Sequence, residues 1–209
     1  MGCLILKEAA QAEIVIKKSR FIATMQPAHT EEEAAEFIAA TKKKYWDARH
    51  NCSAFVIGSS PEITRCSDDG EPSGTAGRPM LEVLLGSGIK DAAVVVTRYF
   101  GGVLLGTGGL VRAYSQAVSD VIEKAEVLER YDGALIAIDT DYSDIGKVLR
   151  IISEQGLAPS DTEYGADVKA EVIVPAEDAD SFIKKLTDAT NGKASVRIKE
   201  KGEYTRRTK

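Results

Sequence analysis

The segment Asp68–Tyr114 decides how this chain folds. It opens with DDGEPSGTAG (Asp68–Gly77) and closes with VVVTRYFGGVLLGTGGLVRAY (Val94–Tyr114). Asp91–Tyr99 is the most β-branched run of the chain, and its apolar core is typical of a central buried strand. About half of the chain's 18 glycines lie in this segment. Because glycine is costly inside regular structure, its clusters mark turns or close approaches of the backbone. We therefore expect the functional surface here.

On the N-terminal side of this centre, the sequence predicts strands with a helix between them. Thr30 and Glu33 form a capping box, and Lys42–Lys44 suit the negative end of the helix that follows it. The predicted elements of this half are strands at Ala12–Pro27 (turning at Lys18-Ser19), Asn51–Gly58 and Ile63–Ser67 (the last two joined across Ser59–Glu62), helices at Pro79–Leu85 and Leu110–Lys124, and a glycine-rich turn at Gly101–Gly109.

Near Arg130–Gly133 the pattern changes. From there the predicted element order is β-α-β-β-α-β, which is the ferredoxin-like plan. We therefore predict a first domain at residues 1–132 and a second at residues 133–209. The predicted elements of the second domain are strands at Ala134–Tyr142, Ala158–Tyr164, Asp167–Val174 and Ala194–Glu200, a helix capped by Ser143 that runs to Gln155, and a helix at Ala176–Thr190. The basic tail after Glu200 is interpreted as a solvated terminus.

Composition narrows the class of protein. The chain has 27 basic and 32 acidic residues, a net charge of -5, which argues against unspecific nucleic-acid binding but leaves room for a local basic groove. Three unpatterned cysteines and two histidines give no zinc motif and fit reduced cytosolic thiols. No apolar run reaches the roughly 18 residues of a spanning helix, and Met1–Leu6 is too short for a signal peptide. We expect a cytoplasmic protein with no membrane partner and no cofactor.

A first candidate site is Gly106–Gly109 (GTGG), between the predicted central strand and the helix after it. Backbone N–H groups at the positive end of a helix suit an anion, and Arg98 and Arg112 could add forked contacts to phosphate. The alternative is that the glycines permit tight packing and the arginines pair with local acids. The pattern is neither a Walker loop nor a dinucleotide fingerprint, because Gly-Lys-Ser/Thr and G-x-G-x-x-G are both missing from it.

A second candidate site is Asp68–Gly77, where three carboxylates fall within four residues. They could hold Mg²⁺ or orient a water, and nearby hydroxyls could bind phosphate or act as nucleophiles if a base such as His50 lay within reach. The alternative is that the acids cap turns and the helix near Pro79, and that His50 is structural. The candidate anion-binding residues of both segments are Arg98, Gly106, Thr107, Gly108, Gly109, Arg112, Ser73, Gly74, Thr75, Gly77 and Arg78. Asp68, Asp69, Glu71 and His50 are candidates for residues that hold these groups in position.

Two aromatic positions stand beside these segments. Tyr99-Phe100 follows the central strand, and Trp46 follows Tyr45 and the lysine run. Their rings could stack on nucleic-acid bases. We favour the alternative that these rings pack in the core.

With these motifs in view, the chain resembles the YigZ/IMPACT family. The resemblance rests on Asp68–Gly77 and on TRYFGG (Thr97–Gly102) continuing to GTGGLVRAY (Gly106–Tyr114), and it extends over essentially the whole chain. It implies an α+β fold: a first domain of the ribosomal-protein type, as in domain IV of elongation factor G, and a second domain similar to that factor's domain V. We expect the N-terminal interaction domain of eukaryotic members to be absent.

The resemblance also implies a functional class. The family is linked to translational control in eukaryotes, and nucleic-acid or ribosome binding is the usual proposal for bacterial members. No catalytic residues come with it. We therefore expect a binding protein for RNA, the ribosome or another polyanion rather than an enzyme. The alternatives are a Mg-dependent enzyme acting on a phosphorylated or nucleotide substrate, and a module that binds a protein partner.

Overall fold

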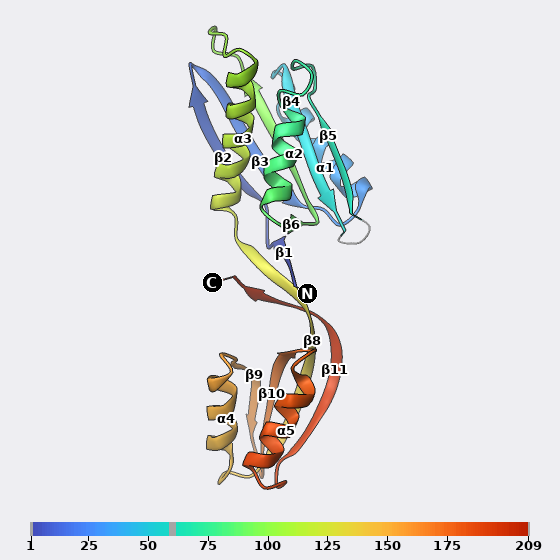
Figure 1. Ribbon diagram of the computed structural model, residues 1–209, viewed down its shortest axis with the longest axis vertical. Coiled ribbons are helices and arrows are strands. Elements are labelled where there is room, and N and C mark those ends of the chain that lie inside the picture. Colours follow the sequence, from blue (N-terminus) through green and yellow to red (C-terminus); the bar gives the residue numbers. More distant parts are fainter. Residues whose placement is uncertain (1, 59–61, 209) are drawn as a thin grey trace. The chain divides into compact units, whose positions relative to one another are not determined.

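The computed structural model describes residues 2–58 and 62–208 (Figure 1). These residues form two compact units, Cys3–Glu129 with Arg207 and Thr208, and Arg130–Arg206 with Gly2. Both combine sheets with covering helices, so the chain is a two-domain α+β protein. Most of the predicted turn at Ser59–Glu62 lies outside the described residues. No helix in the described ranges is long and apolar enough to cross a membrane.

The first unit is built on a five-stranded antiparallel sheet. Its strand order is β2-β3-β7-β4-β5. The central strand β7 is buried at every position except Tyr99, which confirms the strand predicted from the valine run. The strands are β2 (Ala10–Ile16), β3 (Ser19–Pro27), β4 (His50–Ile57), β5 (Ile63–Ser67) and β7 (Ala92–Tyr99). Two short strands, β1 (Cys3–Leu6) and β6 (Ile89–Lys90), pair in parallel outside this sheet.

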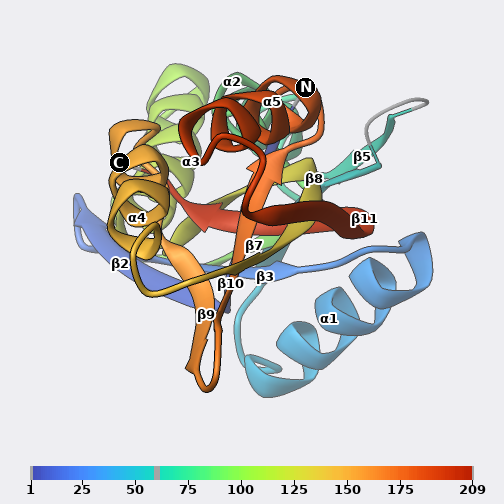
Figure 2. The ribbon, with the colours of Figure 1, turned by 90° about the horizontal axis from the view of Figure 1, so that it is seen from below.

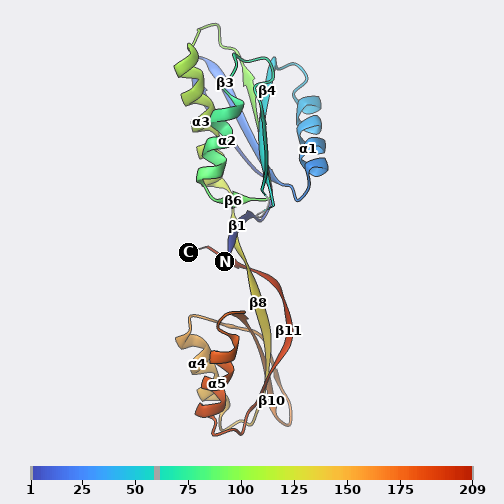
Figure 3. The same ribbon diagram turned by 45° about the vertical axis from the view of Figure 1, so that its right-hand side comes forward.

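Helices cover both faces of the sheet because β7 is apolar on both. Val94 and Val96 belong to the core under α2 and α3, whereas Ala93 and Val95 pack with the residues of α1 on the other face. Figures 2 and 3 show α1 on one side of β3 and β7, and α2 and α3 on the opposite side. The helices are α1 (Glu31–Lys44), α2 (Gly77–Gly86) and α3 (Thr107–Lys124).

The strand register brings both glycine-rich segments to one edge of this sheet. Arg98 pairs with His50, Tyr99 pairs with Arg20, and Ser53 pairs with Ser67. The starts of β3 and β4 and the ends of β5 and β7 therefore lie at the same edge, which we call the loop edge. The segment after β5 and the segment after β7 both begin there.

The second unit follows the predicted element order. β8 pairs with β10 and β11, β9 pairs with β10, and α4 and α5 pack on one face of this sheet (Figure 3). Ile136, Val172 and Leu186 are fully buried between the sheet and the helices. The elements are β8 (Val127–Thr140), α4 (Ile145–Glu154), β9 (Pro159–Tyr164), β10 (Val168–Pro175), α5 (Ala179–Ala189) and β11 (Ser195–Arg207).

The predicted helix start is correct for α1 and differs for the other four helices, among them α2, which begins at Gly77 rather than Pro79, and α5, which begins at Ala179 rather than Ala176. The hydroxyl of Thr30 accepts the N–H of Glu33 at 3.1 Å, so the predicted cap of α1 is correct. The predicted cap Ser143 is wrong, because Asp141 accepts the N–H groups of Ser143 and Asp144 and the helix begins later. α3 begins at Thr107, three residues before the predicted start, so the glycine turn is shorter than predicted.

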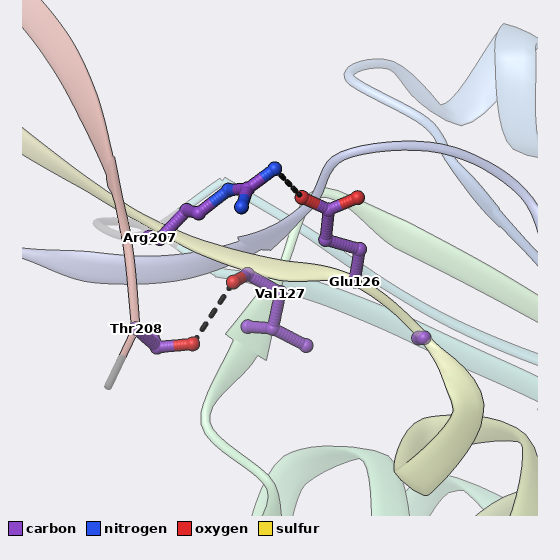
Figure 4. A pocket seen from close by; sticks show the side chains of 5 residues that line it. Glu126, Val127, Arg207 and Thr208 are labelled. Carbon is purple, nitrogen blue, oxygen red and sulfur yellow. Dashed lines mark hydrogen bonds and ion pairs between the residues drawn. The ribbon is translucent and has the colours of Figure 1, made fainter.

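The interpretation of the C-terminal tail as a solvated terminus is wrong. β11 continues to Arg207 and pairs with β8. Arg207 reaches a carboxylate oxygen of Glu126 at 3.4 Å, and the Thr208 hydroxyl donates to the carbonyl of Val127 at 2.9 Å (Figure 4). Glu126 also accepts Lys7 at 2.9 Å. Backbone pairing and these contacts order the tail, which a basic composition alone does not reveal.

Candidate functional site

Glu71 links the two glycine-rich segments from within the protein. Its Oε1 accepts a hydrogen bond from Nη1 of Arg98 on β7 at 2.6 Å and another from the hydroxyl of Tyr114 on α3 at 2.8 Å. All three residues are buried. Burial raises the pKa of the Tyr114 phenol, so this group stays protonated and remains a donor. Glu71 therefore links the segment after β5 to both β7 and α3, the strand and the helix that flank the second glycine segment.

Asp68 caps the start of α2. Its carboxylate accepts the N–H groups of Gly74 at 2.8 Å, Ala76 at 3.0 Å and Gly77 at 2.8 Å. Burial raises the pKa of Asp68, but the three N–H donors outweigh burial and lower it overall. A Cβ at Gly77 would lie 2.7 Å from the backbone of Ser67, so this close approach requires glycine. An incoming anion would have to displace Asp68 to reach these amides.

Asp69 has different partners from its neighbour. It accepts Nζ of Lys42 at 2.6 Å and the N–H of Asn51 at 2.7 Å, while its own carbonyl lies 3.0 Å from Nδ1 of His50. Burial raises the pKa of Asp69, but Lys42 and the Asn51 amide lower it overall. Asp68, Asp69 and Glu71 thus each bind different partners. Within residues 2–58 and 62–208, no group of three or more His, Cys, Asp or Glu could hold a metal ion.

The hydroxyls and the arginine near this loop have local roles. The Thr75 hydroxyl donates to the carbonyl of Pro72 at 2.7 Å and is buried. Ser73 is exposed, and Arg78 pairs with Glu82 at 2.9 Å on the surface of α2. Among the described residues, neither hydroxyl is hydrogen-bonded to His50, whose Nδ1 faces the Asp69 carbonyl. The loop therefore has the contacts of a structural support.

The start of α3 has a different character. Gly106 precedes the helix with a φ of 75°, a backbone conformation that favours glycine, and no side chain caps this end. Leu110 donates to the carbonyl of Gly106, which leaves the preceding amides outside the helical pattern. In the part of the chain that the structure describes, no side chain accepts a hydrogen bond from Thr107, Gly108 or Gly109. This positive end of the helix dipole faces no carboxylate of its own first turn.

Two cations lie beside this helix start. A cavity of about 240 Å³ is lined by Ile16, Lys17, Leu105, Gly109, Arg112 and Gln116. Lys17 and Arg112 have no carboxylate partner among the described residues. Of the predicted site residues, the structure thus gathers Gly109 and Arg112 here, and it adds Lys17.

Lys17 is not among the predicted site residues. The sequence predicts the hairpin turn at Lys18-Ser19, one residue later than in the structure. The turn is formed by Lys17 and Lys18, both with positive φ (46° and 69°). Gly101 packs on it: its N–H donates to the Ser19 hydroxyl at 3.1 Å, and a Cβ there would lie 2.0 Å from the Lys18 carbonyl carbon. Two-residue hairpin turns with positive φ at both positions usually carry Asn, Asp or Gly, so the lysines at these positions give no local signal for the turn.

Several apolar side chains at this edge face solvent. Phe100 is 49% exposed, Val103 41%, and Leu104 and Trp46 each 82%. The expectation that Phe100 and Trp46 pack in the core is therefore wrong. Phe100, Val103 and Leu104 lie within five residues of one another in the loop after β7, and contiguous exposed apolar patches mark interaction surfaces.

Comparisons with known proteins identify the family. Residues 17–122 match the model described as Impact N-terminal domain, and residues 138–193 match Domain of unknown function (DUF1949). IMPACT family member YvyE of Bacillus subtilis (strain 168) is 44% identical over 200 residues, which are 96% of this chain and 91% of that protein. The chain belongs to the IMPACT family.

A second IMPACT relative and one solved structure also match most of the chain. IMPACT family member YigZ of Escherichia coli (strain K12) is 37% identical over 181 residues, 85% of this chain and 88% of that protein. A solved structure titled crystal structure of an hypothetical protein is 33% identical, with a TM-score of 0.61, and the match covers 95% of this chain and 98% of that one. The predicted family resemblance is thus confirmed over both units of this IMPACT protein.

Proposed function

We propose that this IMPACT family member is a non-catalytic, translation-associated binding protein that takes RNA, free or in the ribosome, at the loop edge. One observation carries the proposal. Lys17 and Arg112 line a single cavity with Gly109, at the uncapped start of α3. We call Lys17, Arg112 and the amides of Thr107–Gly109 the α3 anion surface.

Phosphate fits the chemistry of this surface. The first-turn amides and the helix dipole favour negative charge, and a guanidinium can form two parallel hydrogen bonds to phosphate oxygens. The chain has a net charge of -5, so binding depends on local cations rather than overall charge. Lys17 and Arg112 supply these local cations, because they line one cavity and have no carboxylate partner among the described residues.

The Asp68–Gly77 segment supports this surface rather than forming it. Arg98 is held by Glu71, and the amides of Gly74 and Gly77 are held by Asp68. These contacts fix β7 and α3 on either side of the second glycine segment. Pre-ordering the amides and Arg112 in this way reduces the entropy lost on binding.

The proposal includes the domain organisation. The proposed first domain is residues 1–132 and the proposed second domain is residues 133–209, a boundary three residues after the compact unit that ends at Glu129. The antiparallel sheet with α1 on one face supports a ribosomal-protein-type fold similar to domain IV of elongation factor G. The order β8-α4-β9-β10-α5-β11 supports a ferredoxin-like second domain similar to domain V of that factor. The protein works in the cytoplasm.

A salt titration of RNA binding tests the function. Fluorescence anisotropy with a labelled RNA should show that affinity falls as salt rises. The double variant Lys17→Ala/Arg112→Ala should bind more weakly at every sequence. Because two phosphate contacts are lost, the slope of log affinity against log salt should become shallower by about 1.4 on single-stranded RNA. Arg150→Ala is the matched control, because this arginine lies on the exposed surface of α4 and pairs with Glu154. Its slope should match that of the unsubstituted protein.

Equal affinity and slope in the double variant would overturn the proposal. A partner captured from cell extract that survives nuclease treatment and high salt, together with no RNA affinity, would instead identify a protein-binding module.

A further inference from the structure

Trp46 is the side chain whose position the proposed function does not explain. It is the chain's single tryptophan, and 82% of its surface is exposed. Tryptophan is usually well buried, since its ring carries a large apolar area. It stands in the turn that follows α1, just before β4 begins at the loop edge.

The turn that carries Trp46 is fixed on both sides. The Tyr45 hydroxyl accepts Nε2 of Gln11 on β2 at 3.0 Å, and the Asp47 carboxylate accepts the Tyr99 hydroxyl at 2.8 Å. Trp46 therefore projects from a turn anchored to two strands of the sheet. Little conformational freedom of the backbone would be lost when a ligand covers it.

Cations surround this turn without acidic partners. Lys44 lies 5.0 Å from the centre of the Tyr45 ring. Among residues 2–58 and 62–208, no carboxylate pairs with Lys43, Lys44 or Arg49. The nearby acids are engaged: Asp47 accepts Tyr99, and Glu13 pairs with Arg20 at 2.9 Å. The local chemistry is thus aromatic and positively charged.

We propose that Trp46, Tyr45, Lys43, Lys44 and Arg49, here called the Trp46 surface, bind single-stranded nucleic acid by stacking a base on the indole of Trp46. A flat apolar ring beside cations matches a ligand whose flat apolar groups hang from an anionic backbone. Bases are open to such contact only in single strands, because in duplexes their faces are stacked. The inference rests on the proposed function and adds the class of nucleic acid.

The Trp46 surface and the α3 anion surface lie on different faces of the sheet but share the loop edge. Arg98 points to the α3 side, where it contacts Glu71 beside Tyr114. The next residue, Tyr99, points to the α1 side, where it contacts Asp47. A strand bound around this edge has phosphate contacts on one face and a base contact on the other.

The single tryptophan makes the test direct. Titration with a 15-nucleotide oligouridylate should quench Trp46 fluorescence saturably, while a duplex of equal length at equal concentration should not. By anisotropy with labelled oligouridylate, Trp46→Ala should weaken binding about tenfold. Trp46→Phe should keep most of the affinity, because it keeps an aromatic face. Tyr164→Ala is the control, since Tyr164 is 62% exposed on the second unit and should be neutral.

Each outcome separates this inference from the proposed function. Salt-dependent binding that needs Arg112, with no quenching and with full affinity in Trp46→Ala, would overturn the Trp46 surface alone. Quenching that is equal for duplex and single strand would also overturn it. Equal quenching by oligouridylate and oligothymidylate supports stacking without ribose recognition, and stronger quenching by oligouridylate supports RNA. Loss of a protein partner in Trp46→Ala without any nucleic-acid affinity would reassign the surface to a protein.

Discussion

Oε1 of Glu71 lies 2.6 Å from Nη1 of Arg98, and the two side chains are only 3% and 7% exposed. Arg98 also lies 5.5 Å from the Phe21 ring and 5.6 Å from the Phe100 ring. A buried ion pair adds little net stability, because desolvation opposes the attraction, yet losing one partner leaves a bare buried charge. The pair is therefore best understood as a link that fixes the loop after β5 against β7.

Glu71→Ala should destabilise the first unit by about 3–5 kcal/mol, because it leaves the Arg98 guanidinium buried without its carboxylate. Urea unfolding followed by circular dichroism measures this. Glu82→Ala removes the partner of an exposed arginine, Arg78, and should cost no more than about 1 kcal/mol. The double variant Glu71→Leu/Arg98→Met removes both charges and should be more stable than Glu71→Ala. Additive losses in the double variant would contradict a coupled pair.

Asp68→Asn should destabilise the protein by about 1–2 kcal/mol at neutral pH, as expected when a helix cap is lost. The pKa of Asp68 is lowered in the folded protein, and an aspartate in an unfolded chain has a pKa of about 3.9. Its stabilising contribution is thus present above that value and is lost as pH falls through the folded pKa. Urea midpoints measured from pH 6 downward should show that Asp68→Asn removes part of the acid sensitivity. An unchanged pH profile would refute the cap.

Two glycines should tolerate no side chain. A Cβ at Gly101 would lie 2.0 Å from the Lys18 backbone, and one at Gly77 would lie 2.7 Å from the Ser67 backbone. Gly101→Ala and Gly77→Ala should each cost about 1–3 kcal/mol or more, because backbone must move. Gly146→Ala on α4 is the control, since nothing lies within 4 Å of the added Cβ. It should stabilise its helix by about 0.5–1 kcal/mol. Equal effects at all three positions would contradict the close packing.

Sequence patterns predicted the elements whose signals are local. The run Val94–Val96 predicts the central strand, because a strand buried on both faces has apolar residues at consecutive positions. Thr30 predicts the start of α1, because its capping hydrogen bond reaches only three residues along the chain, to Glu33. The glycine cluster predicts a turn that includes Gly108 and Gly109, and this is wrong because both lie inside α3. Glycines can stand in the uncapped first turn of a helix as well as in a turn. Trp46 has no local signal for exposure, since exposure depends on what other elements cover. The same holds for β11, whose end is set by pairing with β8.

Cys52 and Cys66 should differ sharply in reactivity, although both are free thiols. Burial raises the pKa of Cys52 to about 12, and its Sγ donates to the Asp68 carbonyl at 3.0 Å. Cys66 is exposed on β5. Because the thiolate is the reactive form, a disulfide reagent at pH 8 should modify Cys66 first and Cys52 only when the loop opens.

Mass spectrometry of the time course identifies which thiol reacts, and Cys66→Ser confirms the assignment. In Asp68→Asn the loop is held less tightly, so Cys52 should react faster than in the unsubstituted protein while the Cys66 rate stays the same. Cys52 and Cys66 reacting at one rate in the folded protein would show that the segment after β5 opens freely. It could then not hold Glu71 against Arg98 in the way described above.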